Sequence, residues 1–375
     1  MTLRRPVVVL SAANAWDEHR MADAQLAAAL SAHTDVLYVD PPHSVAGRLR
    51  AGAAWRAPRL TQVAPRVVRL SPEVLPGLSR AAVAAANSHL IGSQVAGALR
   101  RLSARPVALI EANLLSPVLG LRNLGRTVYW AQDDFVAMAP LVGIDPRIYR
   151  ANHERLVAEA TLIVAANPAV AASITAATGR PVELIPFGCD AALFHRTTPT
   201  ASTAPTGTAV LMGTLNERLD LGLLTAVAAT GATLRIIGPR SARWDPPGFA
   251  DLLARANVEW LGERPFADLP RLLAGAGVGL VPYTHSAFNE ASFPLKTLEY
   301  LAAGLPVVAT DLPAIRWLDA PDVHVADDAA LFAKTVRALL DATPDERDGT
   351  RERARATAQG HTWAARAELF ADLLG

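Results

Sequence analysis

A lysine and a glutamate stand three residues apart in a short helix predicted between a proline and a glycine. Pro294 suits the first turn, where its missing N–H costs nothing, and Gly304 can take the left-handed conformation that ends a helix. Lys296 adds a full charge to a helix start that already favours anions, and Glu299 lies beside it at the (i, i+3) position. These two side chains could hold a diphosphate and a ribose diol together.

The periodicity of the same segment predicts a helix about three turns long. Leu295, Leu298 and Ala302 form its core stripe, and Lys296 and Glu299 lie along the rim. The alternative is an ordinary Rossmann helix with a Lys–Glu pair on its surface. Because the chain has 36 Lys+Arg but only two lysines, a compact lysine charge at this position favours the functional interpretation.

Short β-branched runs alternate with alanine-rich helical stretches, which is typical of parallel sheets wound with helices. Two series of strands are separated by residues 195–207, which we interpret as a linker. We therefore expect domains at 1–195 and 208–355 and a final helix at 362–375. The predicted strands are Val7–Leu10, Val36–Val39, Val67–Leu70, Val107–Ile110, Thr127–Trp130, Leu162–Val164, Val182–Ile185, Ala209–Met212, Leu234–Ile237, Val258–Leu261, Val278–Val281, Val307–Ala309 and Val323–Val325.

The segment 293–310 closely resembles the donor-binding signature of retaining glycosyltransferases of family 4. Tyr129-Trp-Ala-Gln-Asp-Asp-Phe135, Leu184-Ile-Pro-Phe-Gly-Cys-Asp190 and Gly213-Thr-Leu-Asn-Glu-Arg218 follow the order expected for bacterial surface-polysaccharide enzymes of the teichuronic acid type. The resemblance implies the α/β fold called GT-B, with two facing Rossmann-like, doubly wound domains. The first would serve the acceptor, the second would bind the nucleotide-sugar, and the terminal helix would pack back on the first.

In that family, a glutamate at the position of Glu299 binds the nucleotide ribose, and an earlier glutamate approaches the donor sugar. The earlier position is Ala291 here, and the nearest carboxylate is Glu290, one place before it. The implied donor-binding residues are Gly213, Thr214, Glu290, Pro294, Leu295 and Glu299.

Two cations would act on the diphosphate as catalytic residues, Lys296 and Arg218. Arg218 lies just beyond a predicted strand, at the edge where doubly wound sheets bind ligands. A salt bridge from Arg218 to Glu217 or Asp220 is the structural alternative.

Three further polar residues are candidates for the acceptor side. Asp133 and Asp134 come directly after a predicted strand, and helix capping or a salt bridge is the alternative for both. His285 comes two residues after Tyr283, at the end of another strand and near the donor; a solvated loop histidine is the alternative.

No cofactor and no metal site are expected. No GxGxxG motif indicates a dinucleotide, and no His, Asp or Glu spacing makes a convincing metal site. Cys189, the single cysteine, fits a reducing compartment, and the N-terminal apolar run is better interpreted as a first strand than as a signal peptide. We therefore expect a cytoplasmic protein.

The net charge of +1 hides an uneven distribution. Residues 41–110 hold ten arginines and one acid, with Trp55 among them. Such segments bind anionic membranes or lipid-linked phosphates, which would place the protein at the inner face of the membrane; a solvated basic face is the alternative. No recognition motif accompanies the arginines, so nucleic acid is not expected as a partner.

The resemblance implies a retaining glycosyltransferase that transfers a sugar from a nucleoside diphosphate donor to a carbohydrate or lipid-linked acceptor in cell-envelope polysaccharide synthesis. Two alternatives stay open, a sugar-nucleotide epimerase of the same fold and a catalytically silent carbohydrate-binding or scaffold protein. The absence of a carboxylate at Ala291 favours the silent protein.

Overall fold

A computed structural model describes residues 6–17, 21–46, 59–77, 81–118, 120–121, 124–140, 143–196 and 207–375. Arg48, Arg50, Trp55 and Arg56 of the basic stretch, and most of the predicted linker, lie outside the described residues. The chain forms two compact units, Met1–Pro186 with Trp363–Gly375, and Phe187–Thr362.

The first unit is built on an eight-stranded sheet in the order β10-β9-β8-β7-β1-β2-β5-β4, in which only the pair β4 and β5 is antiparallel. Its elements are β1 (Val7–Ser11), α1 (Ala22–Leu30), β2 (Asp35–Val39), β3 (His43–Ser44), β4 (Arg59–Ala64), β5 (Val67–Ser71), β6 (Glu73–Val74), α3 (Ala81–Arg101), β7 (Pro106–Glu111), β8 (Arg126–Ala131), α4 (Phe135–Met138), α5 (Pro146–Glu159), β9 (Leu162–Ala165), α6 (Pro168–Thr178), β10 (Glu183–Leu184) and α16 (Trp363–Leu374).

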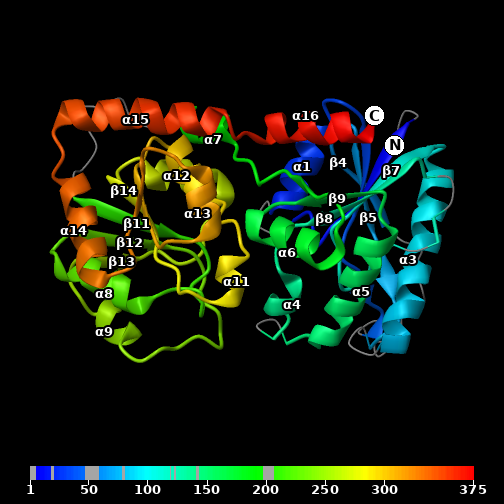
Figure 1. Ribbon diagram of the computed structural model, residues 1–375, viewed down its shortest axis with the longest axis horizontal. Helices are drawn as coiled ribbons and strands as arrows, with labels where there is room; N and C mark the ends of the chain where they lie inside the picture. Colours follow the sequence, from blue (N-terminus) through cyan, green and yellow to red (C-terminus); the bar gives the residue numbers. More distant parts are fainter. Residues whose placement is uncertain are drawn as a thin grey trace. The chain divides into compact units, whose positions relative to one another are not determined.

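Helices cover both faces of this sheet (Figure 1). Ile91 and Val95 of α3 join a buried cluster with Val7 and Val9 of β1. Because neighbouring strand residues point to opposite faces, Trp130 of β8 lies on the other face, where its ring meets Phe370 of α16 at 5.5 Å. The last helix, which also packs on α1, is thus part of the first unit's core.

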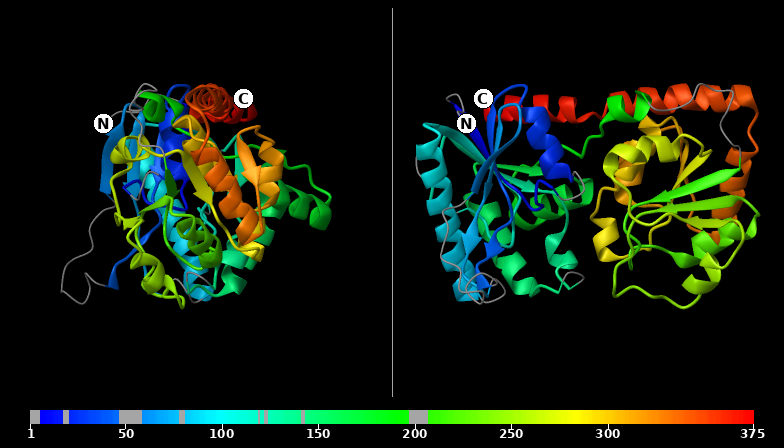
Figure 2. Two further views of the ribbon diagram at one scale, coloured as in Figure 1. Left: turned by 90° about the vertical axis from the view of Figure 1, so that its left-hand side faces the viewer. Right: turned by 180° about the vertical axis from the view of Figure 1, so that it is seen from behind.

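The second unit has a six-stranded, wholly parallel sheet in the order β13-β12-β11-β14-β15-β16. Figure 2 shows it from behind, and helices lie on both of its faces. Its elements are α7 (Ala191–Arg196), β11 (Thr208–Met212), α8 (Leu221–Ala229), β12 (Thr233–Ile237), α9 (Phe249–Leu253), β13 (Val258–Trp260), the 3₁₀ helix η1 (Phe266–Asp268), α10 (Leu269–Leu273), β14 (Val278–Val281), α11 (Ala287–Glu290), α12 (Lys296–Ala302), β15 (Val307–Ala309), α13 (Pro313–Leu318), β16 (Val323–Val325), α14 (Ala329–Leu340) and α15 (Pro344–Gln359).

This order is that of a classical Rossmann sheet, 3-2-1-4-5-6. From β11 the chain adds β12 and β13 on one side of the sheet and then β14, β15 and β16 on the other, so the topological switch point lies between β11 and β14. Ligands of such sheets bind outside the carboxyl ends of the strands at that point. The site of interest should therefore follow Met212 and Val281, the last residues of the two strands.

The boundary between the two units lies earlier in the sequence than the predicted linker. The first unit ends at Pro186 rather than near residue 195. The reason is that α7 packs on α10, α12 and α15 of the second unit, and the Cys189 amide donates to the His361 carbonyl at 2.9 Å. The residues before the linker thus belong to the second unit.

Candidate active site

Two loops meet where β11 and β14 end. The amide of Asp220 donates to the Pro282 carbonyl at 2.8 Å, and that of Thr284 donates to the Arg218 carbonyl at 2.9 Å. The loop after β11 is therefore fastened along the loop after β14. This pairing brings Arg218 next to Tyr283, although the two residues are 65 positions apart in the sequence.

The backbone is tightly packed here. Gly213 has a φ of 121°, and an added Cβ would collide with the Nζ of Lys296. A Cβ on Gly238, after the neighbouring strand β12, would collide with the carbonyl of Gly213. Glycine is thus required for Lys296 to approach the end of β11. The next residue, Thr214, is exposed.

Two cations lie over one aromatic ring. The Arg218 guanidinium carbon is 4.5 Å from the centre of the Tyr283 ring, and Lys296 Nζ is 5.0 Å from it. Arg218 also lies over the ring of Phe288 at 4.7 Å. Cation–π contacts orient both groups without neutralising their charge.

Neutral side chains hold the guanidinium of Arg218. Its Nε donates to Asn289 Oδ1 at 2.7 Å, and its Nη2 donates to Ser292 Oγ at 2.9 Å. The salt-bridge alternative for Arg218 is wrong, because Asp220 instead caps α8 by accepting from the Gly222 amide at 2.8 Å. Within the described part of the chain, neither Arg218 nor Lys296 forms an ion pair with a carboxylate.

Glu299 is buried, so the prediction that it lies on the rim of the helix is wrong. It is 7% exposed, because α12 packs against α7 and α15 as well as against β14. Burial raises the pKa of the Glu299 carboxyl to about 7, and the nearby charge of Lys296 lowers it only in part. Its oxygens accept no hydrogen bond from the described residues, and they are not completely shielded from solvent.

The helix that carries these residues is shorter than expected. α12 spans Lys296–Ala302, about two turns, and Gly304 ends it with a φ of 81°. Pro294 is buried, and Leu295 is half-buried at the N-cap. Anion attraction at this site therefore depends on the charges of Lys296 and Arg218 more than on the dipole of a long helix.

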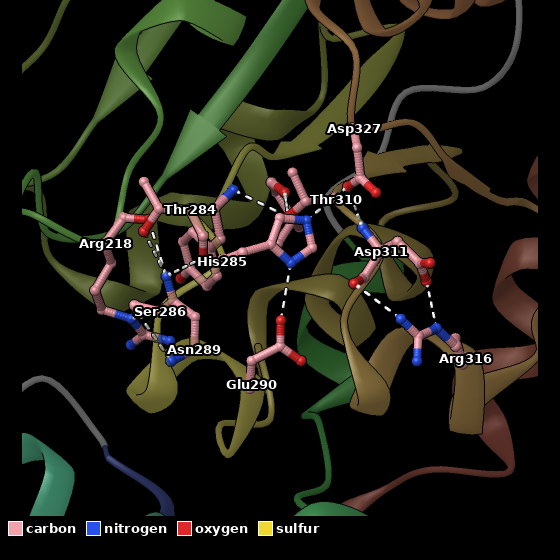
Figure 3. Close-up of polar contacts among 12 residues, drawn as sticks. Arg218, Thr284, His285, Ser286, Asn289, Glu290, Thr310, Asp311, Arg316 and Asp327 are labelled. Atoms are coloured by element: carbon pink, nitrogen blue, oxygen red, sulfur yellow. Dashed lines mark hydrogen bonds and ion pairs between the residues drawn. The ribbon is translucent and has the colours of Figure 1, made fainter.

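His285 lies between two carboxylates (Figure 3). Its Nδ1 is 2.8 Å from Glu290 Oε1, and its Nε2 is 3.0 Å from Asp327 Oδ1. His285 is a half-exposed loop histidine, as the alternative for it proposes, but both of its ring nitrogens contact carboxylates. Glu290, predicted to bind the donor, has one oxygen engaged by this imidazole.

In the first unit, Asp134 caps α4 by accepting from the Ala137 amide at 2.9 Å, as the alternative for it proposes. Asp133 is half-buried beside it. The preceding residue, Gln132, donates to the fully buried Asp23 at 2.6 Å. Burial also raises the pKa of Glu111, at the end of β7, to about 8.

Several site residues were missed from sequence, namely Tyr283, Phe288, Asn289, Ser292 and Asp327. Four of them lie in 283–292, directly after a buried strand and before the donor signature, and this position was the available signal. No such signal existed in the sequence for Asp327, because only the fold brings this residue next to His285.

The described residues contain no group of three His, Cys, Asp or Glu that could hold a metal ion. None of the helices in the described ranges is both long and apolar enough to cross a membrane. Part of the basic stretch is neutralised, since Arg66 pairs with Asp35 at 2.6 Å and Arg69 pairs with Asp17 and Asp40, both at 2.5 Å.

The fold formed by these two units is GT-B, an α/β fold of two Rossmann-like domains. Sucrose-phosphate synthase from Thermosynechococcus elongatus superposes with a TM-score of 0.72 at 16% identity, covering 99% of this chain and 98% of that one. Anabaena HepE, solved in complex with UDP and glucose, gives 0.67 at 15% identity, with 99% of both chains covered. WaaG, a glycosyltransferase involved in lipopolysaccharide biosynthesis, gives 0.65 at 17% identity, covering 98% and 99%.

Sequence comparison adds matches over part of the chain. Residues 221–372 match the family described as Glycosyl transferase-like. A putative teichuronic acid biosynthesis glycosyltransferase, TuaH of Bacillus subtilis (strain 168), is 34% identical over 115 residues. The match spans 30% of this chain and only 29% of the length of that relative.

Proposed function

We propose that the protein is a retaining glycosyltransferase that uses a nucleoside diphosphate sugar as donor. The acceptor would be a carbohydrate or a lipid-linked carbohydrate of a cell-envelope polysaccharide. The GT-B fold, the family match over residues 221–372 and the partial similarity to TuaH support this class.

The two cations over the Tyr283 ring carry the proposal. Like charges brought together without a carboxylate between them repel, so the arrangement favours an anion as its missing partner. At about 4 Å, each unit charge attracts a phosphate charge by on the order of 4 kcal/mol at an effective dielectric near 20, before desolvation is subtracted. A diphosphate would satisfy Lys296 and Arg218 together.

Glu299 supplies the second part of the donor site. A largely buried carboxylate without hydrogen-bond partners from the protein is costly, and the two hydroxyls of a ribose would each donate to it. Lys296 and Glu299 lie on the same helix, α12, at (i, i+3) positions, so one nucleotide would contact both with its phosphates and its ribose. Gly213, Thr214, Pro294 and Leu295 would shape the surrounding wall.

The chemistry that follows is stabilisation of a leaving group. Charge develops on the diphosphate as the glycosidic bond to the sugar breaks, and two fixed cations lower the energy of that state. In the family that the chain resembles, a front-face mechanism needs no protein nucleophile. Asp133 and Asp134 remain our candidates for the acceptor side, and we further propose a cytoplasmic protein that acts at the inner membrane surface.

A panel of UDP-, GDP- and dTDP-sugars tests the donor class by thermal shift and by nucleotide release with and without lipid acceptor. We expect Lys296→Ala and Arg218→Ala each to lower nucleoside diphosphate affinity and turnover at least about tenfold, with little effect on the free nucleoside. Lys334→Ala is the matched control, because Lys334 is exposed on α14. Equal losses for nucleoside and nucleoside diphosphate would contradict the assigned roles.

A further inference from the structure

One short helix holds the guanidinium of Arg218 in place. α11 supplies the ring of Phe288 on one side of the guanidinium and the Asn289 oxygen that accepts from its Nε. The Asn289 amide nitrogen also donates to the Arg218 carbonyl at 3.1 Å and to the Thr284 carbonyl at 2.8 Å. Any shift of α11 would therefore move Arg218.

The last residue of α11 is fastened by His285. Glu290 ends the helix, and its carboxylate contacts one imidazole nitrogen of His285. The other nitrogen contacts Asp327, in the loop after β16, whose Oδ1 also accepts from the Asp311 amide at 2.8 Å. The imidazole thus connects α11 to the loops that follow β15 and β16 (Figure 3).

The protonation state of the imidazole decides whether this connection holds. A carboxylate can only accept hydrogen bonds at neutral pH, so each one needs an N–H from the ring. A neutral imidazole has one N–H, and its other nitrogen would present a lone pair to a carboxylate. Both contacts are favourable only when the ring carries two protons.

The charged groups around His285 favour that form. Glu290 on α11, Asp327 after β16 and Asp311 after β15 are acids, and Arg316 on α13 is paired with Asp311 at 2.6 Å. The hydrogen bonds to Glu290 and Asp327 raise the pKa of His285 above its ordinary value. The ring is about half exposed, so solvent screens part of its interaction with these acids.

We propose that His285 is a positioning residue: in its doubly protonated form it holds α11, and through α11 the guanidinium of Arg218, ready for a nucleotide phosphate. The part of this inference that concerns the phosphate rests on the proposed function. The bridge is complete below the ordinary histidine pKa of about 6.5 and is lost as pH rises through the raised pKa of the folded protein.

Two measurements on wild type and His285→Gln test this inference. Glutamine has both of its N–H donors on one nitrogen, so it cannot reproduce the two donors that the imidazolium presents at separate ring positions. Hydrogen exchange of residues 287–291 in the free protein should show protection that falls in the wild type as pH rises above about 6.5. In His285→Gln, the protection should be low at every pH, after correction for intrinsic exchange. His33→Gln, at an exposed histidine of the first unit, should behave as wild type.

UDP affinity, measured by calorimetry over the same pH range, tests the consequence for Arg218. Below the raised pKa we expect wild type to bind UDP about tenfold more tightly than His285→Gln, and the difference should vanish at high pH. Comparing the two variants at each pH removes the titration of the UDP phosphate, which is common to both. Uridine affinity should be the same in both.

The outcomes separate this inference from the proposed function. Equal protection of residues 287–291 in the two proteins at low pH would overturn the positioning role, whatever UDP does. Failure of the wild type to bind any nucleoside diphosphate would overturn the proposed donor while the exchange result still decides the role of His285 in holding α11.

Discussion

The ammonium group of Lys296 fills the space that a side chain at Gly213 would need. The two residues come from α12 and from the end of β11, so this contact fixes the lysine at the switch point of the sheet. Residue 213 is therefore constrained in two separate ways, by its positive φ and by the closeness of the Lys296 ammonium group.

Gly213→Ala should therefore weaken UDP binding as well as stability. The strained backbone costs about 1–2 kcal/mol, and the new methyl group displaces Lys296 from the Tyr283 ring. Gly231→Ala is a matched control, because Gly231 has a φ of 81° but nothing within 4 Å of an added Cβ. Calorimetry and thermal unfolding should show lost stability in both variants and lost UDP affinity only in Gly213→Ala. Unchanged affinity in Gly213→Ala would mean that Lys296 does not contact the phosphates.

Glu299→Gln should stabilise the free protein at pH 8 and weaken nucleotide binding. The pKa of Glu299 is raised from 4.5 to about 7, so the unfolded chain ionises first as pH rises. Stability is consequently lost between about pH 4.5 and 7, by on the order of 3 kcal/mol, and this loss persists at higher pH. Glutamine, which stays neutral, avoids it.

Denaturant unfolding at pH 4 and pH 8 measures this difference, and Glu352→Gln, at an exposed position of α15, controls for the loss of one charge. We expect the advantage of Glu299→Gln to appear only at the higher pH. A variant that is equally stable as wild type at both values, with unchanged UDP affinity, would return Glu299 to a purely structural role.

The sheets of both units could be predicted because their strands are buried apolar runs. All thirteen predicted strands are present, but β3, β4 and β6 were missed. β4 is an edge strand whose residues are only partly buried, and β3 and β6 are two residues long each. The burial of Glu299 could not be predicted, because helical periodicity describes one buried face and α12 is covered from several sides.

The partners of Arg218 and His285 were beyond sequence for a related reason. Charge complementarity suggested Glu217 or Asp220 as partners of the arginine, but the chain turns so that neutral Asn289 and Ser292 reach it first. The sequence around a residue does not reveal which distant loop the strand order of the sheet places next to that residue. Arg218 and His285 were chosen for their charge and position, and their contacts came from the fold.

Asp134→Ser should separate helix capping from acceptor binding. Serine is a good N-cap, so this variant should keep the stability that Asp134→Ala loses, about 1 kcal/mol. If Asp134 also contacts the acceptor, turnover should fall in both variants. Thermal unfolding and transferase assays distinguish the two cases. Normal turnover in Asp134→Ser would leave the residue with the cap alone.

The basic stretch should bind anionic membranes. Residues 41–110 contain ten arginines and one acid, although Arg66 and Arg69 are paired with acids from outside the stretch. Each basic residue near an anionic leaflet contributes about 1 kcal/mol, and the attraction fades beyond a Debye length. Co-sedimentation with anionic liposomes should therefore fall steeply with added salt.

Replacing Arg48, Arg50, Arg56 and Arg59 with glutamine should abolish this pelleting and leave UDP binding by the second unit unchanged. Arg235→Gln is a useful control, because that arginine lies in the second unit and is paired with Glu259 at 3.1 Å. Neutral liposomes provide the second control. Equal pelleting with neutral and anionic liposomes, or none at low salt, would show that the basic stretch does not dock on a membrane. It would leave a basic face that serves an anionic acceptor or is simply solvated.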